Sequence, residues 1–203
     1  MNTPLPVLFR DRYILVVDKP SGLPSQGTRD GADNLYDQLS HEHRYVGLHH
    51  RLDTPASGAL LLSLDRRVNR GLADAFASHS ITRTYRVFVL GEVDEAGVWD
   101  APIGQHEAIT YWKKRAFGGG ISLIEATLKT GRTHQIRIHA SGSGHPVIGD
   151  KRYGGAAGRA HSRLALHAWR LDFIHPLSDE KISVTAPIPN DLSRLMQKVG
   201  VAE

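Results

Sequence analysis

The 203-residue chain contains no cysteine. This absence excludes disulfides, thiolate nucleophiles and Cys-ligated zinc, so stability must come from the core. No stretch approaches the roughly 18 uninterrupted apolar residues that a membrane span needs, and residues 1–13 lack the pattern of a secretory signal. With 40% hydrophobic residues, the chain can bury a core as one domain or as two small packed lobes. We expect a cytoplasmic protein without membrane contact.

The charge is modest but strongly biased towards arginine. The formal net charge is +4 and the sequence pI is about 9.5, with 18 Arg and 7 Lys. Guanidinium groups match phosphate oxygens and stack on bases, so this bias favours phosphate recognition. A small positive charge also occurs on proteins that never bind nucleic acid, and composition alone does not decide the matter.

Apolar periodicity predicts alternating strands and helices. Short helices are expected around Leu35 and Leu39, capped by Asp33, and over 134–140, capped by Thr133 and ended by Gly142 and Gly144. Two further helices are expected. One is capped by Asp65 and has Val68, Leu72 and Phe76 on one stripe, and the other begins near Asn190. Strands are expected at 13–17, 59–62, 82–91, 121–129 and 164–173, the last paired with 182–184.

Strands in adjacent pairs and strands separated by single helices predict an α+β fold with a mixed, largely antiparallel sheet and flanking helices. A doubly wound nucleotide-binding fold is disfavoured. Residues 47–53 are polar and are expected to form a loop, and Gly154–Gly158 is interpreted as a surface loop.

Two segments carry most of the functional information: His-Arg-Leu-Asp at 50–53, followed by Ser57-Gly58, and Thr-Gly-Arg-Thr-His-Gln-Ile-Arg-Ile-His at 130–139. On these segments the chain resembles the RluA family of RNA pseudouridine synthases. Further matching blocks follow in the family's order over residues 12–188: Asp-Lys-Pro-Ser-Gly-Leu at 18–23, Thr-Tyr-Arg at 84–86, His-Pro-Val-Ile-Gly-Asp at 145–150, Leu-His-Ala at 166–168 and His-Pro at 175–176.

The resemblance implies a pseudouridine synthase fold with a central cleft between two lobes, formed by a single catalytic domain over residues 1–203. It implies no metal and no organic cofactor. Some relatives carry a small S4-type RNA-binding domain in front, and none is expected here because the first matching block begins close to residue 1. The expected partner is RNA, either rRNA or tRNA, with no obligate protein partner, and the expected state is a monomer.

Matched residue by residue, Asp53 corresponds to the family's catalytic aspartate, Tyr85 to its active-site tyrosine and Arg137 to the basic partner of the aspartate. Arg51 corresponds to the arginine that enters the RNA stack where the target base leaves. The other residues expected to take part in RNA binding and base flipping are His50, Arg132, His134 and Lys19, of which Lys19 is also interpreted as pocket architecture.

The chemistry gives each role a physical reason. Cleaving the C1′–N1 bond and rejoining uracil through C5 calls for an ionised carboxylate in a dry pocket, either as a nucleophile or as an electrostatic stabiliser. A nearby Arg137 would keep Asp53 deprotonated. Arg51 could fill the gap left by a flipped base, and Tyr85 could stack on uracil. Taken singly, Asp53 could cap a turn, Arg51 could contact a phosphate and Tyr85 could belong to the core.

Two other functions are compatible with parts of the sequence. His134 and His139, with His49, His50 and Asp53, could form the metal site of a phosphodiesterase, but the i, i+5 spacing places two helical histidines apart. An RNA-binding protein that has lost the chemistry is the other alternative.

The chain departs from the family at two places. Ala56 stands where a threonine is usual, and the segment 102–110 is shorter than expected. Because no S4-type domain is expected, substrate recognition is expected in the catalytic domain or in loops such as 154–162.

Overall fold

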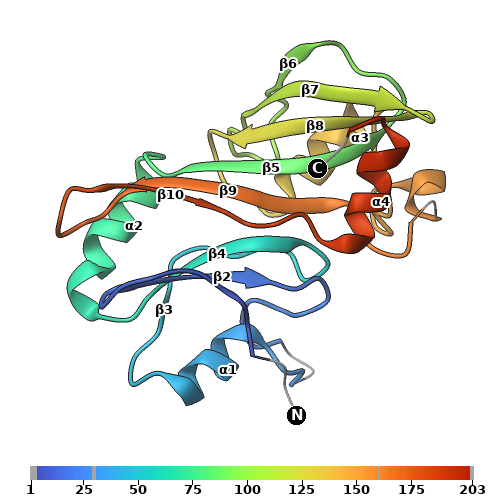
Figure 1. Cartoon of the computed structure of the whole chain (residues 1–203). Helices are drawn as coiled ribbons and strands as arrows, with labels where there is room; N and C mark the ends of the chain where they lie inside the picture. The colour runs from blue at the N-terminus through green and yellow to red at the C-terminus, as the bar shows by residue number, and fades with distance from the viewer. Residues whose placement is uncertain (1–3, 29–30, 160, 202–203) are drawn as a thin grey trace. The chain divides into compact units, whose positions relative to one another are not determined.

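The computed structural model describes residues 4–28, 31–159 and 161–201, which form two compact units. Unit 1 contains the residues up to Thr82 together with Ala168–Pro187, and unit 2 contains Arg83–His167 together with the residues from Ile188 onward. The chain therefore passes between the units three times. Figure 1 shows the elements of both units.

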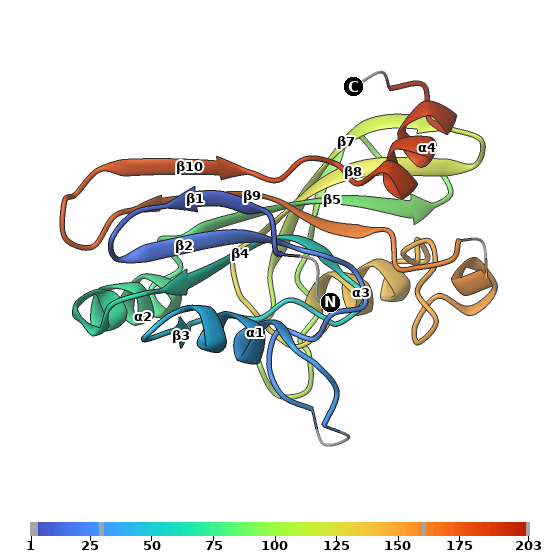
Figure 2. The ribbon, with the colours of Figure 1, turned by 60° about the horizontal axis from the view of Figure 1, so that its bottom comes forward.

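Unit 1 is built from antiparallel strand pairs and short helices. The strands β1, β2 and β4 are neighbours in that order, β3 pairs with β4, and β10 pairs with β9. The helices are short, as Figures 1 and 2 show. The bounds are β1 Val7–Arg10, β2 Ile14–Lys19, α1 Leu35–Glu42, β3 Gly47–Leu48, β4 Ser57–Ser63, the 3-10 helix η1 Arg66–Val68, α2 Asn69–Ala77, β9 Leu166–Ile174 and β10 Lys181–Thr185.

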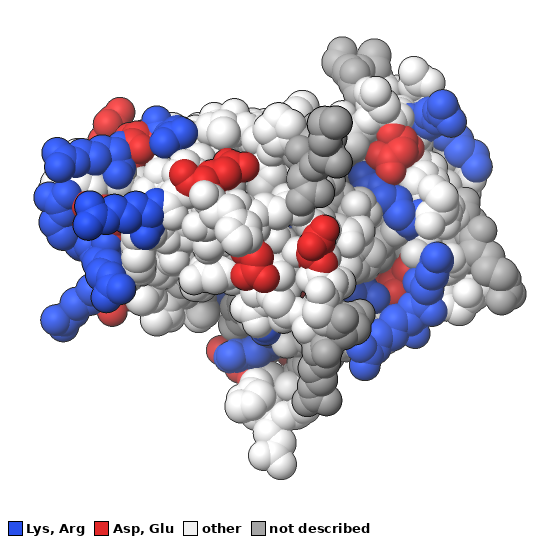
Figure 3. Space-filling view, turned by 90° about the horizontal axis from the view of Figure 1, so that it is seen from below, with Lys and Arg blue, Asp and Glu red and all other residues white. Residues whose placement is uncertain are grey.

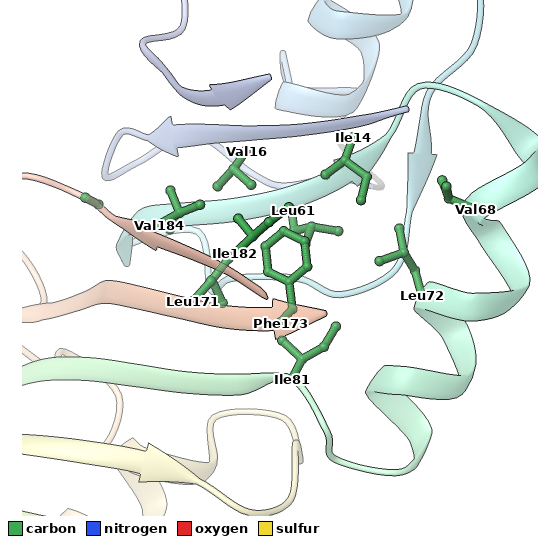
Figure 4. Packing of buried hydrophobic residues seen from close by; sticks show 12 residues of the cluster. Ile14, Val16, Leu61, Val68, Leu72, Ile81, Leu171, Phe173, Ile182 and Val184 are labelled. Carbon is green, nitrogen blue, oxygen red and sulfur yellow. The ribbon is translucent and has the colours of Figure 1, made fainter. Parts of the chain in front are cut away.

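One apolar cluster holds unit 1 together. Val16 of β2 faces Leu61 of β4, and Leu72 of α2 is fully buried in the same cluster. Phe173 of β9 and Ile182 of β10 face each other in the pairing of the hairpin and complete the packing (Figure 4). Because α2 presents Leu72 to the strands, burial of this face fixes the helix against the sheet.

Unit 2 contains the second antiparallel group of strands, in the order β5-β8-β7-β6. Its core consists of Phe88 on β5, Leu123 on β8 and the buried face of α4, where Leu192 is fully buried. The bounds are β5 Thr82–Leu90, β6 Ala96–Trp99, β7 Thr110–Gly118, β8 Ile121–Leu128, α3 Gln135–Gly142, the 3-10 helix η2 Gly155–Arg159 and α4 Asn190–Lys198.

The predicted α+β class is confirmed, and the pairings β1–β2, β2–β4, β3–β4, β9–β10, β5–β8, β6–β7 and β7–β8 are antiparallel. Four strands were not predicted: β1, β3, β6 and β7. The loop expected at 47–53 is corrected at its start, because Gly47–Leu48 forms β3 and pairs with β4. In β7 the apolar positions are interrupted by lysine and arginine, because one face of this strand is solvated. The central cleft and the single catalytic domain stay predictions. Within the described residues, no helix has the length and apolarity to cross a membrane.

The structure also corrects the predicted caps. Asn34, and not Asp33, caps α1 by accepting a hydrogen bond from the amide of Asp37. Asp65 caps the 3-10 helix η1, after which α2 begins at Asn69. Residue His134 stands at the N-cap position of α3 in place of Thr133. The surface loop expected at 154–158 is correct only in part: Gly155 and Ala156 are exposed, but Gly155–Arg159 forms η2, and Gly154 and Gly158 are buried.

Candidate active site

Asp53 lies in the loop between β3 and β4 of unit 1, where the chain makes a tight turn. The amide of Ala56 donates to the carbonyl of Asp53 at 3.0 Å and closes this turn. Ala56 is 1% exposed, so the turn packs around a residue without the hydroxyl that is usual there. The side chain of Asp53 is half-buried.

The segment 19–25 after β2 holds the Asp53 loop by hydrogen bonds to its backbone. The Ser25 hydroxyl donates to the carbonyl of Leu52 at 2.9 Å and accepts from the Leu52 amide at 3.1 Å. The Gly22 amide donates to the carbonyl of Thr54 at 2.8 Å. The Ser21 hydroxyl donates to the carbonyl of Pro55 at 2.7 Å. The backbone on both sides of Asp53 is thereby fixed.

Lys19 belongs to this clamp. Its side chain is fully buried, and its ammonium donates to the carbonyls of Pro20, Leu23 and Thr54 at 2.9, 2.7 and 3.2 Å. An ammonium carries three donors, and three carbonyl oxygens here receive them. This arrangement fits the expected part of Lys19 in pocket architecture better than a direct contact with RNA.

Arg51 and His50, which stand just before Asp53 in the sequence, differ in their contacts. Arg51 is exposed and, among the described residues, has neither a hydrogen bond nor an ion pair. His50 instead accepts a hydrogen bond from the Leu61 amide at 2.9 Å, and its ring stacks on Phe76 with 4.7 Å between centroids. His50 therefore anchors the loop to β4 and α2, while the guanidinium of Arg51 projects from it.

In unit 2, Tyr85 lies on β5 opposite Ala126 of β8 and is 7% exposed. Its neighbours at i+2 and i+4, Val87 and Val89, are fully buried on the same face. Tyr85 therefore lies on an apolar face of β5, where its buried neighbours restrict the orientations that the ring can adopt.

The second motif forms the turn into α3. His134 has the left-handed conformation, with φ of 57°, which non-glycine residues adopt rarely. Gln135 replaces the expected threonine cap, because its side-chain oxygen accepts from the Arg132 amide at 2.9 Å and from the Thr130 hydroxyl at 2.7 Å. Arg132 is exposed, and its Nε donates to the carbonyl of Glu107 at 2.9 Å.

Arg137 on α3 forms a buried bidentate ion pair with Asp150. The distances from Nε to Oδ2 and from Nη2 to Oδ1 are both 2.8 Å, and the two residues are 6% and 1% exposed. Asp150 also accepts from the amides of Arg152 and Tyr153. Burial alone would raise the pKa of Asp150, but the hydrogen bond from Arg137 and the two amides hold it below its usual value.

Asp150 belongs to the matching block at 145–150, and the sequence indicates no role for it. Two buried glycines cover its backbone: a Cβ at Gly154 or at Gly158 would meet the Asp150 carbonyl oxygen at 2.4 or 2.6 Å. Tyr153 adds a ring 5.1 Å from the guanidinium carbon of Arg137, and its hydroxyl hydrogen-bonds Nδ1 of His134 at 3.0 Å. The signal in the sequence was a lone acidic residue between glycines after an apolar run.

In the part of the chain that the structure describes, the histidines have other partners than a metal-ligand cluster. His139 uses Nδ1 with the Thr110 hydroxyl at 3.0 Å and Nε2 with the Ala101 carbonyl at 2.9 Å. In the described ranges, no three His, Asp or Glu residues are grouped so that they could hold a metal ion. The phosphodiesterase alternative therefore gains no support from the structure.

Known proteins resemble this chain in both sequence and fold. The family model described as RNA pseudouridylate synthase matches residues 13–142, which include Asp53, Tyr85 and Arg137. "Ribosomal large subunit pseudouridine synthase D" of Xanthomonas campestris is 34% identical, covering 96% of this chain and 69% of the relative. "Uncharacterized RNA pseudouridine synthase YjbO" of Bacillus subtilis is 34% identical, covering 96% and 76%.

The fold is similar to that of a solved structure, "Human RNA Pseudouridylate Synthase Domain Containing 4". The TM-score is 0.81 at 20% identity, and the match covers 98% of this chain and 94% of that one. Family model, relatives and fold agree with the motifs in unit 1 and unit 2. The chain belongs to the RNA pseudouridylate synthase family, whose enzymes isomerise uridine to pseudouridine in RNA.

Proposed function

We propose that the chain isomerises a uridine of ribosomal RNA and that Asp53 is its central catalytic carboxylate. The large-subunit relatives favour ribosomal RNA as the substrate class. In the reaction, the C1′–N1 bond breaks, uracil turns, a C5–C1′ bond forms, and the proton lost from C5 is balanced by one gained at N1. No atom is added, so the protein must supply only charge, position and proton transfer.

The clamp on the Asp53 loop is the observation that carries this assignment. A carboxylate that acts on a sugar carbon must be held within a fraction of an ångström, and the backbone beside Asp53 is fixed through Ser25, Gly22 and Ser21. Asp53 is half-buried and is the first residue of the turn that the Ala56 amide closes. Asp53 would act either as a nucleophile towards C1′ or by stabilising a developing cation.

Unit 2 supplies the other groups that we propose act on the same uridine. Arg137 would favour the ionised form of Asp53, and the buried pair with Asp150 supports this role because it fixes the planar head of Arg137. Tyr85 would stack on uracil, which its rigid place on β5 supports. From unit 1, Arg51 would occupy the position that the flipped uridine leaves, and its exposed guanidinium supports this role.

The test is the substitution Asp53→Asn, which keeps the size and removes the charge. We expect no detectable pseudouridine in ribosomal RNA transcripts, and RNA binding within a few-fold of the wild type, because phosphate contacts supply most of the affinity. Asp94→Asn is the matched control, since Asp94 is exposed and has no hydrogen bond or ion pair within the described ranges. Substantial turnover by Asp53→Asn would remove the assignment.

A further inference from the structure

Arginines gather at the end of unit 1 that lies away from the Asp53 loop. Figure 3 shows Lys and Arg side chains together at the left-hand end, the side where Figures 1 and 2 have α2 and the turn between β1 and β2. The arginine cluster consists of Arg12 in that turn, Arg66 and Arg67 in η1, and Arg70 in the first turn of α2; all four are exposed.

Aromatic rings support the guanidinium groups of this cluster. Arg12 and Arg67 both lie over the ring of Tyr13, at 5.8 and 4.9 Å from its centroid, and Arg66 lies 5.1 Å from the ring of Tyr45. Both rings belong to half-buried residues. A guanidinium resting on a ring loses little further freedom when it binds a phosphate, so these heads are partly preorganised.

The ring of Tyr45 is itself held in place by a chain of hydrogen bonds. Asn69 donates to the Tyr45 hydroxyl at 2.5 Å and accepts from the Ser63 hydroxyl at 2.7 Å, which also bonds Nε2 of His49 at 3.0 Å. A Cβ on Gly47 would meet the Ser63 side-chain oxygen at 2.2 Å, so this series of hydrogen bonds requires glycine at position 47. The support of Arg66 is thus built into β3, β4 and α2.

The negative charges nearby do not neutralise the cluster. Asp65 makes a bidentate pair with Arg67, at 3.1 and 2.7 Å, which together with Arg12 lowers the pKa of Asp65 to about 2. Asp74 lies 3.8 Å from Arg70, but both side chains are largely exposed and such a pair is weak. Arg12 and Arg66 have no ion pair within the described ranges, so the cluster keeps a net positive charge.

Strands β2 and β4 connect the arginine cluster to the Asp53 loop. Strand β4 begins after the Asp53 turn and ends two residues before Asp65, and β2 runs from the Arg12 turn to Lys19, whose ammonium reaches Thr54. The seven residues of β4 are joined by rises of about 3.3 Å, which place the cluster about 20 Å from the catalytic loop. One folded RNA element can reach both.

We infer that the arginine cluster is a second RNA-binding surface, which grips the phosphate backbone of the substrate about 20 Å from the target uridine. It reads no sequence: guanidinium groups on aromatic supports recognise phosphates and the shape of a paired stem. It supplies affinity and register, while the Asp53 loop supplies chemistry. This inference rests on the proposed function for its RNA partner.

The test removes three positive charges and leaves the Arg67–Asp65 pair intact. Arg12→Gln, Arg66→Gln and Arg70→Gln are combined in one variant. The control combines Lys113→Gln, Arg194→Gln and Lys198→Gln, which removes the same charge from positions on β7 and α4. Binding of a stem-loop transcript that contains the target uridine is measured over a range of salt concentrations, with single-turnover rates at saturating RNA.

We expect the dissociation constant of the cluster variant to rise about tenfold, with the slope of log K against log salt smaller by about two to three. The saturating rate should stay within about twofold of the wild type. When the stem is shortened below about 20 Å from the uridine, the difference between the variants should disappear. For the control variant, the slope of log K against log salt should differ from the wild-type slope by less than about one.

Equal slopes and affinities for the two variants would overturn the inference. The two proposals fail separately. If the wild type forms no pseudouridine while RNA binding still depends on the cluster, the proposed function fails and the surface stands. If product forms normally and the cluster variant binds as the control does, only the surface fails.

Discussion

In unit 1 the charged group of Asp53 is placed through its backbone, whereas in unit 2 Arg137 is held by its own head group. Hydrogen bonds fix the chain on both sides of Asp53 and leave its carboxylate half-buried. Arg137 instead uses two nitrogens to bind the buried carboxylate of Asp150. The backbone hydrogen bonds fix the position of the Asp53 loop, while a group held by its head, such as Arg137, is fixed in orientation and is costly to change.

This difference predicts that Arg137→Met destabilises the protein more than a substitution at Lys19 or Arg51 does. Methionine leaves Asp150 buried without its partner, which costs about 3–5 kcal/mol in the free energy of unfolding. Activity should also fall by at least about a hundredfold, which corresponds to about 2.7 kcal/mol of lost transition-state stabilisation. Urea unfolding and single-turnover rates measure the two effects.

A double variant separates these two losses. Arg137→Met combined with Asp150→Asn removes the orphaned charge, while the amide oxygen can still accept from Arg152 and Tyr153. Stability should return in large part and activity should not. If the double variant regains the rate as well, Arg137 was needed only for folding.

Asp150→Asn alone should have an intermediate effect that depends on pH. Because the pKa of Asp150 in the folded protein lies below its usual value, its ion pair contributes stability above about pH 4, and this contribution is lost as the pH falls through the folded pKa. At pH 7 the variant should be about 1.5–3 kcal/mol less stable. Urea unfolding between pH 7 and pH 3 should show the two proteins converging in acid; a constant difference would contradict this linkage.

Lys19→Met should cost about 1–3 kcal/mol, because it leaves buried carbonyls without their donor. Methionine has a similar length, so the apolar packing of the stem is retained. The loss should appear as faster hydrogen exchange at the amides of Leu52 and Ala56, which lie in the clamped loop. Lys181→Met, at an exposed position on β10, is the control. Unchanged exchange would mean that the segment 21–25 holds the loop without Lys19.

The fold was predictable from the sequence where burial follows a simple period. Two predicted features depend on apolar side chains that recur regularly along the chain. These are the helical stripe with Val68 and Leu72 and the pairing of 171–173 with 182–184. Strand β7 was missed because its solvated face carries Lys113 and Arg115. Periodicity reports burial, so a half-exposed strand gives a weaker signal than a buried one.

The candidate site was predictable only in part. Motifs identified Asp53, Arg51 and Arg137, but the hydrogen bonds that position this site join residues far apart along the chain. Ser25 precedes Leu52 by 27 residues, and Asp150 follows Arg137 by 13. Such partnerships depend on the folded geometry and leave no periodic trace.

The start of α3 was misjudged for a local reason. Gln135 reaches back to the Arg132 amide and takes the place of a threonine cap, and His134 adopts the left-handed conformation. Cap preferences favour short side chains, so a glutamine that closes the turn from inside the helix is not expected from them.

The smallest effect on stability is expected for Arg51→Ala, because the exposed Arg51 side chain has no hydrogen bond or ion pair within the part of the chain that the structure describes. The free energy of unfolding should change by less than about 0.5 kcal/mol. This makes Arg51 the cleanest place to test base flipping, since any loss of activity cannot come from a damaged fold.

If Arg51 fills the vacancy left by the target uridine, Arg51→Ala should slow catalysis most where unstacking costs most. The measurement is the ratio of wild-type to variant single-turnover rates on two versions of one target RNA, with the uridine paired in one and unpaired in the other. We expect a larger ratio on the paired RNA. Arg51→Lys should recover little, because an ammonium cannot stack in the gap as a guanidinium does. An equal ratio on both RNAs would reduce Arg51 to a phosphate contact and leave the assignment of Asp53 unaffected.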